Sequence, residues 1–273
     1  MQQGCGGRAL VVCYHAVSPT WPAPLSVTPE HFRAQIARLL WRGYRPVTFA
    51  DAVAAGRGQK LVAITFDDGY RSVLEHAAPI LAKLGAPATV FVPTAHVGSD
   101  RPMSWAGIDR WVGTEHEAEL SPLGWDDLGR LSDSGWEIGS HTRTHPHLSR
   151  VGPEALREEL TESRRACEEH IGRRCRSVAY PYGDVDERVL AATADAGYEY
   201  GAALTVSTPA LQPLHWPRIG IYRDEPTWRF ELKVAAPVQR LLGSPVGPLV
   251  AAGLARRAAR RRRETLGHAS GTA

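Results

Sequence analysis

Short continuous runs of apolar residues alternate along the chain with longer stretches in which apolar residues recur every three or four positions. The runs have the length of buried strands, and there are six of them: residues 9–13, 61–66, 88–92, 136–139, 177–180 and 198–204. Glycine or proline borders several of these runs, as is usual where a strand gives way to a turn. The pattern predicts six strands.

The stretches between the runs have helical spacing. The clearest follows Thr28, which can cap a helix, with Pro29 in the first turn and Gly43 as the stop. One face of this predicted helix is apolar and carries Phe32, Ile36, Leu39 and Leu40. Further helices are expected at residues 73–84, 153–171 and 186–196.

Predicted helices repeatedly end at a glycine that directly precedes the next element, as at Gly43, Gly85, Gly135 and Gly197. Repeated strand and helix units of this kind imply a mainly parallel sheet. The number of strands favours a closed or nearly closed barrel over an open, doubly wound sheet. We therefore expect an α/β barrel in a single domain.

Residues 93–124 interrupt this rhythm, because proline, glycine and serine are scattered there without a sustained period. Loops of such length are usually lids or binding loops. Trp105, Trp111 and Trp125 lie in or beside this segment, and their indoles could stack on sugar rings or pack into the core. The sequence leaves both roles open.

Charge is unevenly distributed along the chain. The net charge is +3, but six arginines within residues 256–263 contribute +6, so the remainder carries −3. A nucleic-acid groove across the fold is therefore not expected. For the tail, the pattern favours a solvated, partly frayed helix and leaves open weak contact with an anionic membrane surface.

The cysteines and the N-terminus indicate a reducing compartment. Cys5, Cys13, Cys167 and Cys175 have no CxxC spacing, and a chain of 273 residues can build a core without disulfides, so free thiols are expected. No secretory leader is readable, and no 18-residue apolar span occurs. We expect a cytoplasmic protein, with any membrane contact at the inner face.

Two adjacent carboxylates, Asp67 and Asp68, follow the strand at residues 61–66 and are followed by Gly69. Paired carboxylates at the end of a buried strand are costly to desolvate unless a cation or a proton shares the site. A metal ligand beside a general base would explain the pair. An exposed Asp-Asp-Gly turn is the alternative.

His141 and His145 follow the strand at residues 136–139, with a spacing that suits zinc or a similar metal, although surface or capping histidines would have the same spacing. Tyr182, between Pro181 and Gly183, follows a third strand and could aim a backbone N–H at a developing oxyanion. An ordinary turn is the alternative there. Because the carboxyl ends of barrel strands meet on one face, we expect these groups to share one site.

Three motifs in this order, TFDDGY, SHTRTH and AYPYG, resemble the signature motifs of the polysaccharide deacetylase family, the NodB-homology domain of carbohydrate esterase family 4. Tyr14-His15 and Pro217-Arg218-Ile219 also resemble a branch of that family. The resemblance covers about residues 9–222 and implies a distorted (β/α)7 barrel. It predicts a catalytic barrel domain at 9–232 and a basic C-terminal extension at 233–273, partly disordered or amphipathic.

Carried over to this sequence, the resemblance makes Asp67 the general base and makes Asp68, His141 and His145 the metal ligands. It assigns the backbone N–H of Tyr182 to the oxyanion hole. Two histidines and one carboxylate leave coordination positions open for water and substrate, which agrees with this assignment. The expected metal is Zn²⁺, with Co²⁺ or Mn²⁺ as alternatives.

Two positions depart from the family pattern. The arginine that usually orients the base would fall at Ala179, and Arg218 is the candidate substitute, with a surface arginine as the alternative. The late histidine that usually protonates the leaving amine has no counterpart in a Leu-rich motif. His215 and His15 are candidates for that role, although a structural role is the stronger expectation for each.

The predicted reaction is hydrolysis of the acetamide of an N-acetylhexosamine unit in a poly- or oligosaccharide, with an N-acetylated glycan as the binding partner. Two alternatives stay open: a metal-dependent amidase acting on a cyclic or other non-sugar amide, and a catalytically weak carbohydrate-binding relative. The presence of Asp67 argues against the binding protein, which would not need a base.

Overall fold

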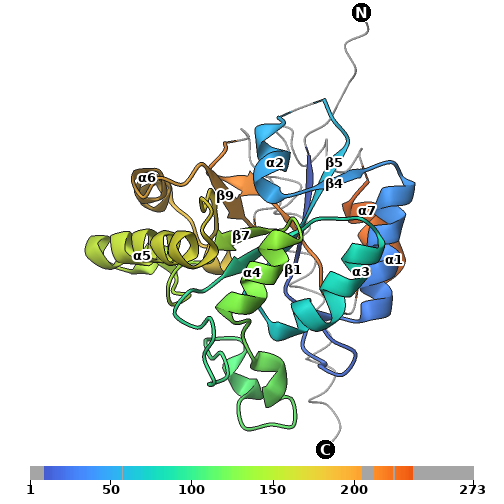
Figure 1. Cartoon of the computed structure of the whole chain (residues 1–273), viewed down its shortest axis with the longest axis horizontal. Coiled ribbons are helices and arrows are strands. Elements are labelled where there is room, and N and C mark those ends of the chain that lie inside the picture. The colour runs from blue at the N-terminus through green and yellow to red at the C-terminus, as the bar shows by residue number, and fades with distance from the viewer. Residues whose placement is uncertain (1–8, 57, 205–211, 224, 236–273) are drawn as a thin grey trace, which may run out of the picture.

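Parallel strands form the centre of the molecule, and helices surround them (Figure 1). The computed structural model describes residues 9–56, 58–204, 212–223 and 225–235. All ladders between its named strands are parallel, and the main sheet has the order β10-β9-β8-β7-β6-β5-β1-β11. Its longer strands are β1 (Leu10–Tyr14), β5 (Leu61–Phe66), β6 (Thr89–Val92), β7 (Glu137–Ser140), β8 (Ser177–Ala179) and β9 (Tyr200–Ala203).

The segment at residues 216–220 joins the two ends of this sheet. Its first part, β10 (Trp216–Pro217), pairs with β9, and its second part, β11 (Ile219–Gly220), pairs with β1. Arg218 lies between the two parts and donates its backbone N–H to the carbonyl of Ala203. One short segment thus closes the ring in the seventh strand position, which confirms the distorted (β/α)7 barrel.

Three short strands lie outside this ring. Strand β4 (Arg45–Val47) pairs with the beginning of β5, and β2 (Ala16–Val17) pairs with β3 (Ser26–Val27) in a separate two-stranded sheet. This small sheet follows β1 directly. It therefore lies at the carboxyl end of the barrel strands.

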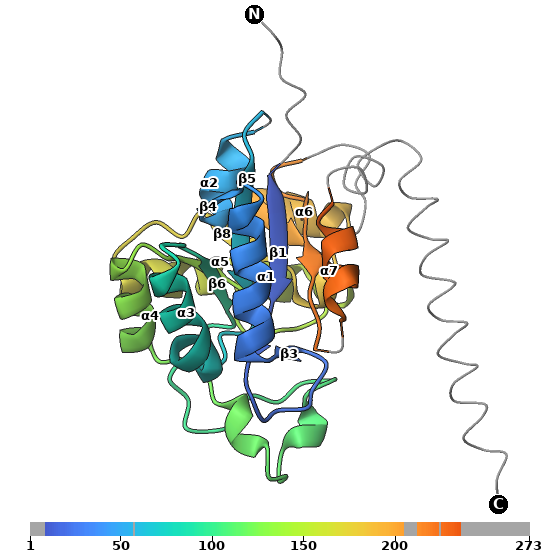
Figure 2. The same ribbon diagram turned by 90° about the vertical axis from the view of Figure 1, so that its right-hand side faces the viewer.

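Helices cover the outside of the ring: α1 (Pro29–Trp41), α2 (Phe49–Ala54), α3 (Ala78–Lys83), α4 (Trp125–Asp133), α5 (Pro153–Ile171), α6 (Glu187–Asp195) and α7 (Thr227–Lys233). Figure 2 shows α1 and α7 side by side. Glu231 of α7 joins them, because its carboxylate pairs with Arg38 and Arg42 of α1. In the described ranges no helix is both long and apolar enough to cross a bilayer.

Side chains of the strands alternate between two apolar clusters. Leu10 and Val12 of β1 belong to the cluster that packs beneath the helices. Val11 belongs with Ala63 of β5 to a second cluster, composed mostly of strand residues, inside the ring. Because this alternation has a period of two, it also turns Cys13 and Thr65 inward at the carboxyl ends of their strands. The Asp67 position follows Thr65 at the same end.

The six predicted strands are confirmed within two residues at each end, as are the helices predicted at residues 153–171 and 186–196. The helix after Thr28 is confirmed with its cap, since the Thr28 hydroxyl accepts the backbone N–H of His31. The helix predicted at residues 73–84 is wrong in its first turns. A π-helical turn, Val73–Ala77, precedes α3, because Pro79 has no N–H for the carbonyl of Glu75.

Several elements had no predicted range, among them β4, α2, α4 and α7. Helix α4 illustrates the reason, since it contains Gly129, which lowers helix propensity. Leu128 and Leu131 of this helix are buried, and the helix packs against α5 and β7. Tertiary packing therefore stabilises it. The C-terminal extension, including the arginines of residues 256–263, lies outside the described residues from 236 onward.

Candidate active site

Three loops at the carboxyl ends of β5, β7 and β8 carry all the predicted site residues except Arg218. Four non-glycine residues in the described part of the chain have a left-handed backbone, and all four lie in these loops: Asp68, Thr142, His145 and Tyr182. This conformation costs an ordinary residue of order 1–3 kcal/mol and tends to persist at functional positions. Three of these residues are ones that the sequence singled out.

Gly69 allows the first loop to turn tightly after the two carboxylates. Its φ is +65°, and a Cβ atom at this position would lie 2.8 Å from Cγ1 of Val92 on the neighbouring strand. Glycine avoids both the backbone strain and this close approach. The turn thus places Gly69 directly against Val92 of β6.

Asp68, His141 and His145 form a compact group of buried donors. Their ligand atoms lie within 4.8 Å of one another. The Nε2 atoms of His141 and His145 lie 3.4 and 3.3 Å from the same oxygen, Oδ1 of Asp68. Burial raises the pKa of Asp68, but hydrogen bonds from both histidines outweigh it and hold this pKa well below its usual range. An ionised carboxylate between two imidazoles is a donor set that suits a divalent metal ion.

Hydrogen bonding and stacking orient the two imidazoles. Nδ1 of His141 lies 2.8 Å from the carbonyl oxygen of Ala179, and an Nδ1–H that donates to this oxygen leaves Nε2 free to bind a metal. His145 is held by rings instead, because Trp105 stacks on it at 4.2 Å and Tyr182 meets it edge-on at 4.8 Å. Both Nε2 atoms are thereby directed toward Asp68.

Glu159 anchors the loop that carries the histidines, and the sequence reasoning missed it. One oxygen of this helix α5 carboxylate accepts the backbone N–H groups of Arg143 and Thr144, both at 2.8 Å, and the other accepts the Thr144 hydroxyl at 2.6 Å. Glu159 is 8% exposed and lies between Leu156 and Leu160 on the buried side of the helix. An acidic residue on an otherwise apolar helix face was the signal that could have identified it.

Arg218 forms a bidentate pair with Asp67 inside the barrel. Nη1 lies 2.6 Å from Oδ1 and Nη2 lies 2.7 Å from Oδ2, and both side chains are almost fully buried. Burial raises the pKa of Asp67, but the charge of Arg218 opposes it, so that the pKa falls to about 2. Ala179, where the family arginine was expected, contributes only its carbonyl, to His141.

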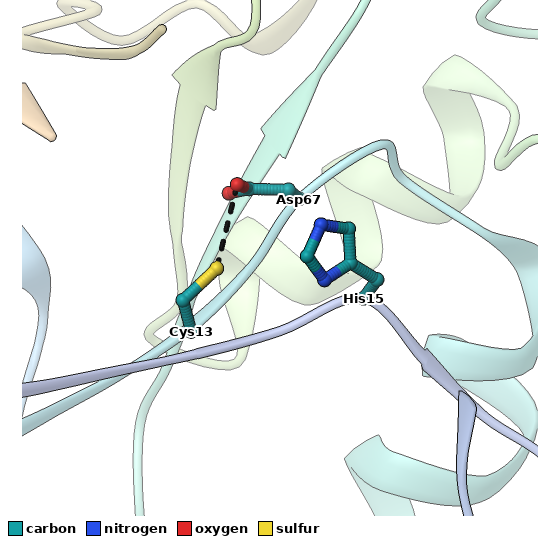
Figure 3. Close-up of side chains that lie close together, drawn as sticks. All are labelled: Cys13, His15 and Asp67. Atoms are coloured by element: carbon teal, nitrogen blue, oxygen red, sulfur yellow. Dashed lines mark hydrogen bonds between the residues drawn. The ribbon is translucent and has the colours of Figure 1, made fainter. Parts of the chain in front are cut away.

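Cys13 and His15 also lie beside Asp67 (Figure 3). The Cys13 thiol is 3.4 Å from Oδ2 of Asp67, and His15 is 8% exposed. The other histidine candidate, His215, precedes β10. No hydrogen bond, ion pair or ring contact joins His215 to Asp67 within the part of the chain that the structure describes. The geometry therefore favours His15 as the histidine that accompanies the carboxylate.

Tyr182 lies at the rim of the site with a φ of 59°. Its ring is 38% exposed and stacks on His147 at 3.9 Å, while its edge contact with His145 connects it to the metal-binding group. His147 in turn lies 3.4 Å from a carboxylate oxygen of Asp184. These contacts support the third loop where it meets the second.

The three tryptophans of the irregular segment have different surroundings. Trp105 stacks on His145, Trp111 meets Trp21 edge-on, and Trp125 stacks on His170 of α5. All three are partly buried against the core. Core packing therefore covers much of the surface of each indole. Among these three, Trp105 is in ring contact with a residue of the site. The segment also pairs with the histidine loop, since the N–H of Thr94 donates to the carbonyl of Thr142.

Comparison with known families agrees with this geometry. The family model described as polysaccharide deacetylase matches residues 54–201, which is more than half of the chain and includes all three motif loops. The chain belongs to the polysaccharide deacetylase family. The family resemblance read from the motifs is thus confirmed.

Two relatives have low sequence identity to this chain, but the similarity extends over most of its length. The Staphylococcus aureus (strain MRSA252) poly-β-1,6-N-acetyl-D-glucosamine N-deacetylase is 27% identical over 214 residues, which cover 73% of this chain and 69% of that protein. The Bacillus subtilis protein YxkH is 26% identical over 196 residues, or 70% of this chain. The match spans 62% of the length of YxkH, so part of that relative has no counterpart here.

Solved structures share the fold. IcaB from Ammonifex degensii is 26% identical, with a TM-score of 0.67 over 86% of this chain and 98% of that one. The Streptococcus pyogenes deacetylase PplD, solved in complex with acetate, has a TM-score of 0.70 at 21% identity and covers 84% of this chain and 99% of that one. The second likeness concerns the fold alone.

Proposed function

We propose that this protein is a divalent-metal-dependent N-deacetylase that hydrolyses acetamide groups on N-acetylhexosamine units of a glycan. The observation that carries the proposal is the pair of adjacent buried carboxylates with separate partners: Asp68 between two histidines and Asp67 on a guanidinium. A binding protein would need no carboxylate fixed beside a metal-binding group. The name of the S. aureus relative supports the reaction class.

The proposed metal ligands are Asp68, His141 and His145. Their chemistry fits a borderline divalent ion, and Zn²⁺ is the first choice, with Co²⁺ or Mn²⁺ as alternatives. The fit also has an electrostatic reason, because Asp67, Asp68 and Arg218 together leave the buried site with one excess negative charge when the histidines are neutral. When bound, the ion supplies Lewis acidity that acidifies water and polarises the acetamide carbonyl.

Asp67 is the proposed general base. A carboxylate with a pKa near 2 is ionised at every physiological pH, but it is a weak base, so it can accept a proton only from a water that has been made acidic. Arg218 keeps Asp67 ionised and fixes both of its oxygens. The guanidinium is therefore a positioning group in the proposed reaction, and it need not touch substrate.

Two further groups complete the proposed chemistry. His15, whose ring faces Asp67, is the proposed donor of a proton to the leaving amine. The backbone N–H of Tyr182 is proposed to stabilise the negative charge that develops on the acetamide oxygen. Together these residues add water to the carbonyl carbon, break the carbon–nitrogen bond and release acetate and a free amine.

The proposed substrate class is a polymer or oligomer of N-acetylglucosamine, and a β-1,6-linked chain is the first to test because the S. aureus relative is named for it. The purified full chain should release acetate from such oligomers, and mass spectrometry should show the loss of acetyl groups. Chelator should abolish the release, and Zn²⁺, Co²⁺ or Mn²⁺ should restore it. Acetate release that is unaffected by chelator would contradict the metal, and binding without release would contradict the enzyme.

A further inference from the structure

A second set of metal-binding side chains lies against Asp67, next to its oxygen Oδ2. Sγ of Cys13, a ring nitrogen of His15 and a carboxylate oxygen of Asp67 lie within 4.8 Å of one another, and all three residues are buried. This set shares no residue with the group around Asp68. Figure 3 shows the edge of the His15 ring that carries both nitrogens turned toward Cys13 and Asp67.

One ligand atom of this second set lacks a partner in the part of the chain that the structure describes. Nδ1 of His15 is buried and has no hydrogen-bond partner among the described residues. The residue is only 8% exposed. The Cys13 thiol lies 3.4 Å from Oδ2 of Asp67 and 3.6 Å from the carbonyl oxygen of Tyr14, so it donates only weak S–H hydrogen bonds that a metal–sulfur bond can replace. Buried polar groups usually have a partner, so the unpartnered His15 nitrogen beside this thiol and carboxylate, within the described residues, indicates a place for a ligand.

We propose that Cys13, His15 and Asp67 form a second, inhibitory site for a thiophilic divalent ion such as Zn²⁺ or Cd²⁺. A thiolate, an imidazole and a carboxylate are the three ligand types that zinc takes in proteins. On binding, the Cys13 thiol releases its proton to solvent and a metal–sulfur bond forms, so no oxidant or reductant is needed. Asp67 can take part while it is paired, because a carboxylate accepts at about four lone-pair positions and Arg218 uses one on each oxygen.

Electrostatics makes the second site weaker than the first. An ion there lies close to the Arg218 guanidinium, which is 2.7 Å from the same Asp67 oxygen that faces Cys13. An ion in the group around Asp68, the next residue, adds further repulsion. The second site therefore fills only when metal is in excess of the amount that activates the enzyme.

Occupancy of the second site inhibits the reaction, and this consequence rests on the proposed function. The ion would take a lone pair of the general base, Asp67, and would coordinate His15, the proposed proton donor. Both proton transfers would then be blocked while the group around Asp68 keeps its own metal. Activity is expected to rise with the first equivalent of Zn²⁺ and to fall with excess.

The test compares wild-type full-length protein with Cys13→Ser, in which the thiolate ligand is lost and the side-chain volume is nearly kept. Cys175→Ser, which removes another buried free thiol, is the control. Cd²⁺ titration should give wild type and the control about two equivalents of bound ion and a cadmium–thiolate absorption band in the ultraviolet with the second. Cys13→Ser should bind about one equivalent and lack the band.

Inhibition is measured on the same three proteins. Mutating a residue that merely hydrogen-bonds to a metal ligand lowers metal affinity by about 10–100-fold. Because Cys13 is a proposed ligand itself, Cys13→Ser should raise the Zn²⁺ concentration for half inhibition at least about tenfold. Its activity with one equivalent of Zn²⁺ should stay close to that of wild type. If wild type binds only one equivalent of Cd²⁺ and shows no cadmium–thiolate band, the second site does not exist. This outcome is independent of whether the protein deacetylates glycans. A normal band with the same inhibition in all three proteins overturns the inhibitory role.

Discussion

Asp67 and Asp68 are neighbours in the chain and are both buried, yet their carboxylates have different partners. Asp67 continues the inward alternation of β5 and meets Arg218, while Asp68 turns away with a φ of 70° and meets His141 and His145. The guanidinium beside Asp67 and the two imidazoles beside Asp68 distinguish a proposed base from a proposed metal ligand. Environment, more than residue type, assigns such roles.

The largest effect is expected on the Asp68 side of this comparison. His141→Ala removes one of three proposed ligands, and we expect loss of bound metal together with a fall in kcat of at least about 1000-fold, since a metal ion supplies several kcal/mol to such a reaction. Elemental analysis after dialysis measures the metal. Replacement of His170, which stacks on Trp125 on the outside of the barrel, is the control. Full metal occupancy in His141→Ala would disprove the ligand assignment.

Asp67→Asn should distinguish the role of Asp67 from that of Asp68. Because Asp67 is proposed as a base and not as a ligand of the activating metal, kcat should fall by about 100- to 10,000-fold while one equivalent of metal stays bound. Steady-state kinetics and elemental analysis on the same sample check both parts. If the activating metal is lost as well, the division of roles between the two residues is wrong.

Arg218→Ala should have a smaller effect on rate and a distinctive effect on pH. Because Arg218 lowers the pKa of Asp67 to about 2, its loss raises that pKa, and the acidic limb of kcat/KM should move to higher pH. We expect kcat to fall by tens to hundreds of fold with metal content unchanged.

Two controls accompany the Arg218 experiment. Removing one partner of a buried ion pair costs about 3–5 kcal/mol of stability, so thermal melts must show that the variant is folded at the assay temperature. Arg176→Ala, which removes a partly exposed ion pair with Glu199, should leave the pH profile in place. Added guanidinium should partly restore the rate of Arg218→Ala. An unmoved acidic limb would show that Arg218 does not hold Asp67 ionised.

The smallest of these effects is expected at Glu159. Glu159→Gln weakens the three hydrogen bonds that hold the histidine loop, so metal affinity should fall by about 10–100-fold while kcat at saturating metal stays close to wild type. Competition with a chromogenic chelator measures the affinity. Glu158→Gln is the matched control, because that neighbouring side chain is exposed. Equal affinities in the two variants would remove Glu159 from the support of the site.

Much of the architecture could be predicted because local patterns encode it. Apolar runs of four to seven residues identified all six longer strands, and the cap, first-turn proline and stop glycine identified α1. The motif loops were predictable for the same reason, since each follows a strand and contains its own turn residues, such as Gly69 and Gly183. Helix α4 and the break before α3 were not, because packing and a proline override their local pattern.

By itself, the sequence determined which residue types gather at the strand ends: two adjacent carboxylates, two histidines four residues apart and a tyrosine in a rigid turn. The family resemblance made Arg218 a candidate partner of Asp67, but only the tertiary structure decided which side chains meet. Arg218 is 151 residues from Asp67, and Cys13 is 54 residues from it, so neither contact has a local pattern. Barrel closure by residues 216–220 and the inward alternation of β1 bring these side chains to Asp67, because strand register sets which atoms meet inside a closed ring.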